Sequence, residues 1–349
     1  MTVRSGFPEG PHARLSTPED EKKQGVEDCA DEHLLSLEIP AMLRTGVESS
    51  GNDCNTELTT GTAISPAYAA QCMQDTKRTI QFMRGVHQAI SDLLQRLPDR
   101  PIHILYAGCG PYAPLVLPLL PLFSAEQVNV TLLDVHRASL DSVSRLIQEL
   151  SLGDYVADVI CADAACYQND PDRPIHLLVV ETMLSALEQE PQVAITYNLM
   201  PQLAPGGILI PERIGIEAVL LDPEQAFCEP DSGTVHDAPE YNPIPLGQVF
   251  ELSMGSATSN PARFTNQSEP LTSYQLPGST IQMPDTMPSG LVPMLTTEID
   301  IYQTLHLRNS DSGLTRPRVF PPGPPIEPGS QLAFTYEVCE RPGLRVHRV

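Results

Sequence analysis

One stretch constrains the fold of this chain more than any other, a short apolar run that ends in a glycine-containing turn. It reads Ile102-His103-Ile104-Leu105-Tyr106-Ala107-Gly108-Cys109-Gly110-Pro111-Tyr112, and apolar residues continue beyond it. This pattern predicts a buried strand over 102–107, a tight turn, and a helix over 112–123. Glycine accepts positive φ and lacks a Cβ, so the turn can bring its backbone close to a ligand. We also expect the helix to present unpaired N–H groups at its start.

Further apolar runs end in acidic residues. The run over 129–133 leads to Asp134, and the run over 156–161 is followed by Asp163. An acid at the end of the strand after a glycine turn is placed to hydrogen-bond the hydroxyl groups of a ribose. The turn lacks the third glycine of G-x-G-x-x-G, which makes an NAD-dependent oxidoreductase a weaker hypothesis. The sequence therefore favours a nucleoside-binding α/β domain.

The run Leu105-Tyr106-Ala107-Gly108-Cys109-Gly110 resembles the first motif of class I S-adenosylmethionine (SAM) methyltransferases. Tyr106 stands where that family usually has an acid. The resemblance covers about residues 60–222, and it implies SAM as the cofactor. It also implies an α/β fold with a Rossmann-like, mostly parallel sheet, an N-terminal helical cap and a smaller C-terminal β-rich domain. The cofactor-binding residues that it implies are Tyr106, Gly108, Gly110, Asp134 and Asp163.

Two other segments are similar to the protein arginine methyltransferases. They are Val180-Glu181-Thr182-Met183-Leu184-Ser185 and the L-x-P-G-G-x-L-I-P-x-R run over 203–213. The family holds a substrate guanidinium between two glutamates, of which Glu181 matches the first, while Glu190 and Glu188 compete for the second. The chain contains no tryptophan, so the family's Thr-His-Trp loop is absent. We therefore transfer the architecture and not protein arginine as the acceptor.

The domain organisation follows from changes in composition along the chain. Residues 1–58 carry 12 Asp and Glu against 5 Lys and Arg and are expected to be a disordered leader. A helical cap is expected over 59–100, the Rossmann-like domain over 101–222, and the β-rich domain over 223–349. Within the cap, Ser65 and Pro66 predict the start of a helix that continues to residue 97, with a bend or break at Gly85.

The expected elements of the Rossmann-like domain alternate between strands and helices, which is typical of a parallel sheet. The strands are expected over 102–107, 129–134, 156–161, 175–180, 207–211 and 212–221, and the helices over 112–123, 137–151 and 187–203. The expected strands of the last domain are 249–252, 279–283, 296–307 and 331–338.

The charge and the cysteine spacing exclude several classes of protein. The net charge of −23 repels phosphate backbones, which disfavours a nucleic-acid partner. None of the eight cysteines forms a C-x-x-C pair or a cluster with histidine, so we expect no metal site. Neither a signal peptide nor a run of 18 apolar residues is present, and we expect a cytoplasmic protein without a membrane partner. A homodimer is one expectation for its assembly.

The carboxyl ends of the strands gather the candidate site residues. Glu181 follows a strand buried on both faces, where a carboxylate is seldom accidental. Glu181 and Tyr106 are the candidate catalytic residues. The candidate substrate-binding residues are Glu181, Thr182, Tyr68 and Arg78. His87 is a further candidate for a base, because histidine titrates near neutral pH.

These residues favour a SAM-dependent transferase that moves a methyl group to a small-molecule acceptor. The Tyr106 substitution leaves a second reaction open, in which SAM cyclises to azetidine-2-carboxylate and releases methylthioadenosine. The helix start at Ser65-Pro66 and the later run over 106–112 are also similar to SAM-using enzymes of nonribosomal-peptide pathways, some of which catalyse this cyclisation. A third hypothesis is a catalytically silent SAM fold that serves as a binding protein.

Overall fold

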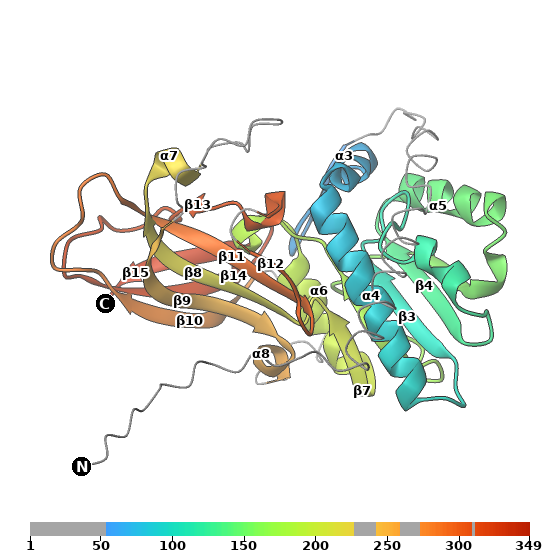
Figure 1. The fold of residues 1–349 in the computed structure, drawn as a ribbon. Coiled ribbons are helices and arrows are strands. Elements are labelled where there is room, and N and C mark those ends of the chain that lie inside the picture. The colour runs from blue at the N-terminus through green and yellow to red at the C-terminus, as the bar shows by residue number, and fades with distance from the viewer. Residues whose placement is uncertain (1–53, 227–241, 259–272, 309–310) are drawn as a thin grey trace, which may run out of the picture. The chain divides into compact units, whose positions relative to one another are not determined.

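The computed structural model of the chain describes residues 54–226, 242–258, 273–308 and 311–349 (Figure 1). All described residues belong to one compact unit of the chain. Most of the leader expected over 1–58 therefore lies outside the described residues.

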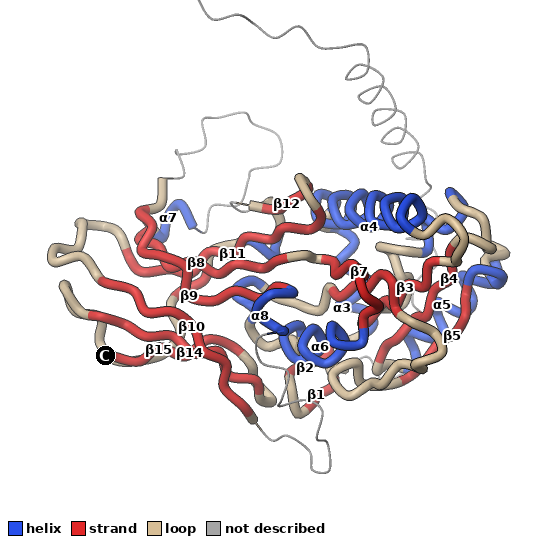
Figure 2. The backbone as a smooth tube through the Cα atoms, turned by 90° about the horizontal axis from the view of Figure 1, so that it is seen from below, coloured by secondary structure: helices blue, strands red, loops and turns tan. Residues whose placement is uncertain are grey.

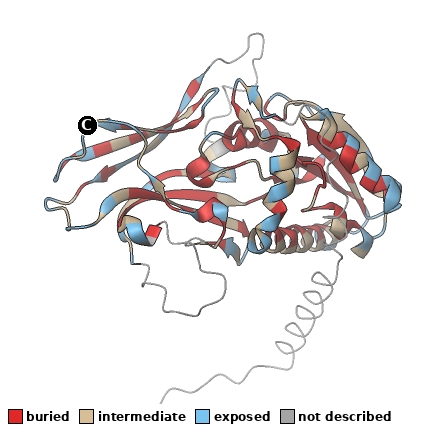
Figure 3. Cartoon of the chain, turned by 90° about the horizontal axis from the view of Figure 1, so that it is seen from above, coloured by how far each residue is buried: buried red, intermediate tan, exposed pale blue. Residues whose placement is uncertain are grey.

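A parallel five-stranded sheet forms the first half of the described chain, with strand order β5-β4-β3-β6-β7. Every residue of β3 and β6 is buried, and each strand is apolar apart from one histidine, His103 in β3 and His176 in β6 (Figure 3). The chain order reverses on the two sides of β3, so the crevice beyond its carboxyl end is the place where a ligand fits. The strands are β3 (Ile102–Ala107), β4 (Val128–Asp134), β5 (Val156–Cys161), β6 (Ile175–Val180) and β7 (Leu203–Ile210).

The helix expected over 66–97 is divided, but not at Gly85. It comprises α3 (Pro66–Gln71), a 3₁₀ turn and α4 (Thr76–Arg96). The side chain of Ser65 caps α3, as predicted, while Asp75 leaves the helical conformation and caps α4 through the N–H of Arg78. No helix in the described part of the chain combines the length and apolar character that crossing a membrane requires.

The helix expected over 112–123 is wrong. The segment forms turns followed by a 3₁₀ helix over Leu117–Leu122. Its apolar spacing is helical, but Pro114, Pro118 and Pro121 each lack an N–H and clash with the preceding turn of an α-helix. The glycine turn is consequently not followed by the α-helical N-terminus that the sequence suggested.

The other helices follow the sequence more closely. α5 (Arg137–Glu149) packs on β4 and β5, close to its predicted range. α6 (Gln192–Leu199) is shorter than the expected 187–203, and a 3₁₀ turn over Met200–Gln202 leads from it into β7. Cys161 is exposed, because β5 is the edge strand of the sheet.

The second half of the described chain is an antiparallel β-rich region (Figure 2). One sheet has the order β12-β11-β8-β9, with β13 also paired to β11, and another has the order β10-β14-β15. The predicted α/β fold with a smaller β-rich part is thus confirmed. The strands are β8 (Arg213–Leu221), β9 (Ile244–Ser253), β10 (Tyr274–Gln282), β11 (Val292–Tyr302), β12 (Leu305–Leu307), β13 (Arg318–Val319), β14 (Gln331–Val338) and β15 (Gly343–Arg348). The short helices in this half are α7 (Pro223–Ala226) and α8 (Met254–Thr258).

Two predicted strands are arranged differently from expectation. The strand over 212–221, assigned to the Rossmann-like domain, forms β8 and pairs with β9 and β11 of the β-rich region. The strand expected over 296–307 is a hairpin, since β11 and β12 pair antiparallel across a turn in which Gln303 has φ 50°. The period-two pattern continues through the turn and conceals it.

Helix α4 connects the two halves. It packs on β3, β6 and β7 and also contacts β11 and β12 (Figure 1). The hydroxyl of Tyr302 donates to the Asp92 carboxylate of α4 at 2.7 Å. Gly85 lies inside an unbroken part of α4, and a Cβ at this position would stand 2.5 Å from the Cγ2 methyl of Ile301. Gly85 therefore permits the close approach of β11.

We predict that Gly85→Ala lowers the free energy of unfolding by about 1–2 kcal/mol. The gain in helix propensity is up to about 1 kcal/mol, but the new methyl group must displace Ile301 in a packed interface. Chemical denaturation measures the change. Gly153→Ala is the control, because a Cβ at Gly153 meets nothing within 4 Å. A Gly85→Ala protein more stable than wild type would contradict the packing argument.

Candidate functional site

A pocket lies at the carboxyl ends of β3, β4 and β6, with about 940 Å³ of empty space that is partly open to solvent. The structure brings most of the predicted site residues to its walls. Tyr68, which is 62% exposed, lies outside the lining, and so do His87 and Glu188. Further lining residues that the sequence did not single out are Leu58, Ala63, Ile64, Cys72, His136, Ser139, Pro191 and Ile195.

The glycine turn after β3 is fastened to β4 by its own backbone. The N–H groups of Gly108 and Cys109 both donate to the carbonyl of Leu133, at 2.8 and 3.1 Å. The N–H of Gly110 donates to Oδ2 of Asp134 at 2.9 Å. Both glycines have positive φ, of 71° and 63°. The N–H groups of Gly108, Cys109 and Gly110 are thus all used in hydrogen bonds to the end of β4.

Thr182 occupies the space that the absent side chain of Gly108 leaves. A Cβ on Gly108 would stand 2.2 Å from the Cγ2 methyl of Thr182. The N–H of Thr182 donates to Oε1 of Gln192 at 2.8 Å, and Nε2 of Gln192 donates to the carbonyl of Val180 at 3.0 Å. Gln192 is buried and fixes the start of the loop after β6. No sequence signal singles it out, because a glutamine at the start of a helix usually faces water.

Asp134 combines a structural contact with a free capacity to accept hydrogen bonds. Its Oδ1 accepts the N–H of His136 at 2.8 Å, and its Oδ2 accepts that of Gly110. Oδ1 also lies 3.4 Å from Nδ1 of His136. A carboxylate can accept about four hydrogen bonds, so Oδ2 retains a site for a ligand hydroxyl. Asp134 lines the pocket, at the position where the sequence predicts ribose binding.

Asp163 follows β5 and lines the same side of the pocket. Its Oδ1 accepts the N–H of Ala165 at 2.8 Å, which holds the loop in a tight turn. Burial raises the pKa of Asp163, although the hydrogen bond from Ala165 opposes this change. Its second oxygen can accept a hydrogen bond from an amino group.

An acid cluster lies at the other side of the pocket. It consists of Glu181, Glu190 and the guanidinium group of Arg78. Arg78 of α4 forms an ion pair with Oε2 of Glu181, and the Glu181 side chain is only 4% exposed. Oε1 of Glu181 is buried without a hydrogen-bond partner. Burial raises the pKa of Glu181 while Arg78 opposes the rise. Burial acts against the charge of Arg78 as well, but its pKa is raised because Glu181 outweighs that effect.

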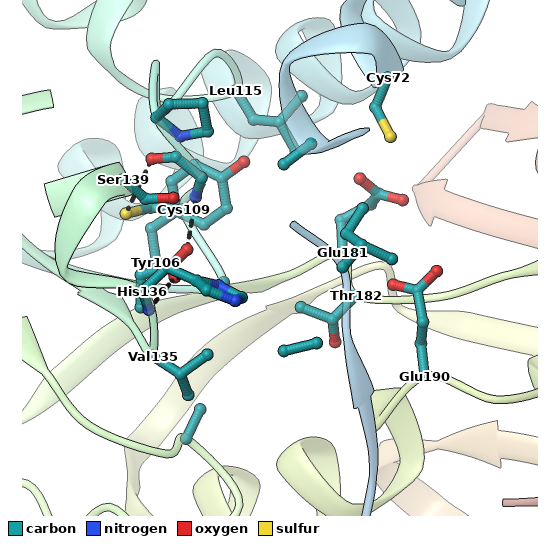
Figure 4. A pocket seen from close by; sticks show the side chains of 18 of the residues that line it. Cys72, Tyr106, Cys109, Leu115, Val135, His136, Ser139, Glu181, Thr182 and Glu190 are labelled. Atoms are coloured by element: carbon teal, nitrogen blue, oxygen red, sulfur yellow. Dashed lines mark hydrogen bonds and ion pairs between the residues drawn. The ribbon is translucent and has the colours of Figure 1, made fainter. Parts of the chain in front are cut away.

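Glu190 is the second carboxyl group of the acid cluster. Its side chain lies on the same side of the pocket as that of Glu181 (Figure 4). Burial, and then the negative charge of Glu181, raise the pKa of Glu190 to about 8. The competing candidate, Glu188, does not line the pocket. Glu190 can therefore gain or lose a proton near neutral pH inside the cavity.

Tyr106 lies at the end of β3 and is buried at the pocket wall. Burial, and then the charge of Glu181, raise the pKa of its phenol well above the usual value. The phenol is thus neutral and can donate a hydrogen bond. A phenolate acting as a base is not available at this position.

A short hairpin forms another wall. It consists of β1 (Thr56–Leu58) and β2 (Gly61–Ala63), and the chain continues through Ile64 along the pocket (Figure 2). Oγ1 of Thr56 lies 3.0 Å from Nε2 of His136, and the N–H of Thr62 donates to the carbonyl of Gln189 at 2.7 Å. Strands of three residues are too short for the sequence pattern to reveal them.

His87, considered as a base, lies outside the pocket lining and packs its ring 5.5 Å from that of Phe123. Burial lowers its pKa, so the side chain is neutral. Cys72, in contrast, lines the pocket next to Arg78 and Glu181, and burial raises the pKa of its thiol. Cys72 lies at the pocket because the helix is interrupted between α3 and α4. The sequence instead predicts a bend or break at Gly85.

Comparisons with known proteins give little beyond the general arrangement of the chain. No model of a known protein family matches the sequence, and no curated protein matches it. A solved structure of the Trypanosoma brucei PRMT1 enzyme–prozyme heterotetrameric complex with AdoHcy is similar, with a TM-score of 0.46 and 11% identity. The match covers 81% of this chain and 98% of the other. The function of the chain has to be inferred from the residues of its own pocket.

We predict that Glu190→Gln stabilises the protein at alkaline pH by about 1–3 kcal/mol and has little effect near pH 5. The folded-state pKa of Glu190, about 8, lies above that of an unfolded glutamate. The folded state therefore binds more protons between about pH 4 and 8, and this contribution to stability falls as pH rises through that window. Glutamine carries no charge and removes the dependence.

Urea denaturation at pH 5, 7 and 9 measures this difference. Glu149→Gln is the matched control, since Glu149 is exposed at the end of α5. Equal stability differences for both variants at all three pH values would show that Glu190 is not held as the geometry indicates.

Proposed function

We propose that the pocket binds SAM and that the chain transfers its methyl group to a nitrogen atom of a small basic molecule. Asp134 and Asp163 would hold the ribose hydroxyls and the adenine amino group, because both carboxylates line one side of the pocket with oxygens free to accept. Arg78 would hold the carboxylate of the methionine part, since its guanidinium is the positive group of the acid cluster.

The observation that carries the acceptor proposal is the shortage of hydrogen-bond donors in the acid cluster. Two buried carboxyl groups, Glu181 and Glu190, share one guanidinium, and one oxygen of Glu181 has no partner. A buried unpaired carboxylate is costly, so the cluster favours a ligand that carries protons on nitrogen. A cationic amine or guanidine supplies both the charge and the hydrogen-bond donors.

The residues of the pocket can prepare such an acceptor. SAM supplies a methyl group on a sulfonium, from which a neutral thioether leaves. Once ionised, Glu190 accepts a proton from the acceptor nitrogen, which frees the electron pair that forms the new N–C bond; with a pKa of about 8, its ionised form becomes abundant at mildly alkaline pH. Glu181, which is paired with Arg78, orients the acceptor, and Tyr106 offers a neutral hydroxyl at the pocket wall.

The size of the acceptor follows from the walls around the acid cluster. The β1–β2 hairpin contributes Leu58 and Ala63 to the lining, and Pro191 and Ile195 contribute from α6 and the loop before it. These apolar side chains cover part of the pocket beside the acid cluster and reduce its contact with water, which strengthens the electrostatic contacts inside. A small molecule fits this description better than a protein side chain on a bulky partner.

A second candidate reaction uses the same carboxyl group. Glu190 lies in one cluster with Arg78, so a base stands beside the residue proposed to hold the methionine carboxylate. With Glu190 as the proton acceptor, the α-amino nitrogen of SAM could attack its own γ-carbon. The C–S bond would break, giving azetidine-2-carboxylate and methylthioadenosine. This reaction requires no separate acceptor, and methyl transfer yields S-adenosylhomocysteine instead.

We predict that Asp134→Asn weakens SAM binding five- to 150-fold, about 1–3 kcal/mol, through loss of charge-assisted hydrogen bonds to the ribose. Isothermal titration calorimetry measures the affinity. Asp158→Asn is the control, because Asp158 lies on the edge strand, pairs with Arg173 and does not line the pocket. Unchanged affinity in Asp134→Asn would refute the ribose contact, and absence of SAM binding by the wild type would favour a silent fold.

We also predict that Glu181→Gln retains SAM affinity within a few-fold and lowers turnover by at least tenfold. Incubation with SAM alone, and then with a panel of small amines and guanidines, is followed by mass spectrometry. S-adenosylhomocysteine that forms only with an acceptor supports methyl transfer, while methylthioadenosine from SAM alone supports cyclisation. Full turnover in Glu181→Gln would remove this residue from the site.

A further inference from the structure

The loop that carries Glu190 has an unusual backbone. Ala186, Leu187 and Gln189 have φ values of 58°, 56° and 65°, although none of them is glycine. Side chains with a Cβ disfavour this region, and a residue found there is held by its surroundings. Ser185, Ala186 and Leu187 are fully buried. The groups that hold the loop therefore decide where Glu190 lies.

Strand β11 of the β-rich region forms the first set of hydrogen bonds to this loop. Oγ1 of Thr297 accepts the N–H of Ala186 at 2.8 Å and lies 3.1 Å from Oγ of Ser185. The same Ser185 hydroxyl also donates to the carbonyl of Arg316. Thr297 is 1% exposed, so these polar groups have no water to replace a lost partner.

Strand β14 forms a second hydrogen bond to the loop. The hydroxyl of Tyr336 donates to the carbonyl of Leu187 at 2.7 Å. Its ring is fully buried and stacks on Phe250 of β9 with ring centroids 4.8 Å apart. Gln189 forms two further backbone hydrogen bonds. Its N–H donates to the carbonyl of Pro342 at 3.0 Å, and its carbonyl accepts the N–H of Thr62 at 2.7 Å. The loop is thus held on both sides of its left-handed residues.

We propose that Tyr336 and Thr297 are positioning residues of the site, which act on the reaction by holding the 185–189 loop and thereby the Glu190 carboxyl group. The catalytic part of this inference rests on the proposed function, in which Glu190 accepts a proton. The structural part does not, since the two hydrogen bonds join the loop to the β-rich region whatever the pocket binds. The β-rich half then serves as a support for the acid cluster.

The consequence for Glu190 follows from its burial. If the hydrogen bond to Leu187 or to Ala186 is lost, the strained residues can relax to ordinary φ values and carry Glu190 away from Glu181. A carboxyl group that gains access to water titrates closer to its normal range, so its pKa falls. For a base, the rise of the rate with pH would then move to lower pH, and the maximal rate would fall because the carboxylate is misplaced.

The test compares Tyr336→Phe and Thr297→Val with wild type. Each substitution keeps the shape of the side chain and removes one hydrogen-bonding group. We expect kcat to fall at least tenfold, SAM affinity to change less than threefold, and the ascending limb of the pH profile to move from near pH 8 to lower pH. Tyr302→Phe is the matched control, because this tyrosine of β11 bonds Asp92 of α4 and lies outside the pocket.

Hydrogen–deuterium exchange of the peptide over 182–191 provides a readout that does not depend on activity. We expect exchange there to become at least tenfold faster in both variants and to stay unchanged in Tyr302→Phe. Exchange equal to that of the control would overturn the inference, as would a pH profile that does not move in an active enzyme. If wild type forms no product, the proposed function fails, and the exchange experiment alone decides whether the loop is held in this way.

Discussion

The buried ion pair between Arg78 and Glu181 is the interaction on which the arrangement of the pocket depends. A carboxylate that is 4% exposed needs a partner, and Arg78 reaches it from α4, across the top of the sheet. Arg78 is in place because Asp75 ends the preceding turn and starts the helix at the right residue. With the guanidinium committed to Glu181, Glu190 has no cation of its own and keeps its proton up to about pH 8. The difference between the two glutamates thus originates in one helix cap.

The parallel sheet was predictable because its central strands are buried on both faces. The sequences of β3 and β6 are apolar apart from one histidine in each, and hydrophobic burial leaves few alternatives for such runs. The segment after β3 was mispredicted because a helical spacing of apolar residues says nothing about missing N–H groups. Pro114, Pro118 and Pro121 override the spacing locally.

The candidate site was predictable to the extent that its residues follow strand ends. Tyr106, Asp134, Asp163 and Glu181 reach one pocket because parallel strands finish at the same edge. The remaining walls come from contacts between distant segments, which a single sequence does not encode locally. Gln192 is functional only through its hydrogen bonds to the loop after β6, and Leu58 only because a three-residue strand places it there. Tyr68, selected for its chemical type, faces solvent instead.

If the pocket binds SAM as proposed, the hydrogen bonding of the glycine turn limits which other adenosine compounds it can recognise. The N–H groups of the turn donate to Leu133 and Asp134, and Pro111 has no N–H group. A diphosphate bridge, which dinucleotides and nucleoside diphosphates carry, would meet a carboxylate there and no amide donors. An adenosine whose 5′ substituent is uncharged or cationic avoids this repulsion. For a SAM-binding pocket, the hydrogen bonds of this four-residue turn would thus act against phosphorylated nucleotides, which are abundant competitors in cells.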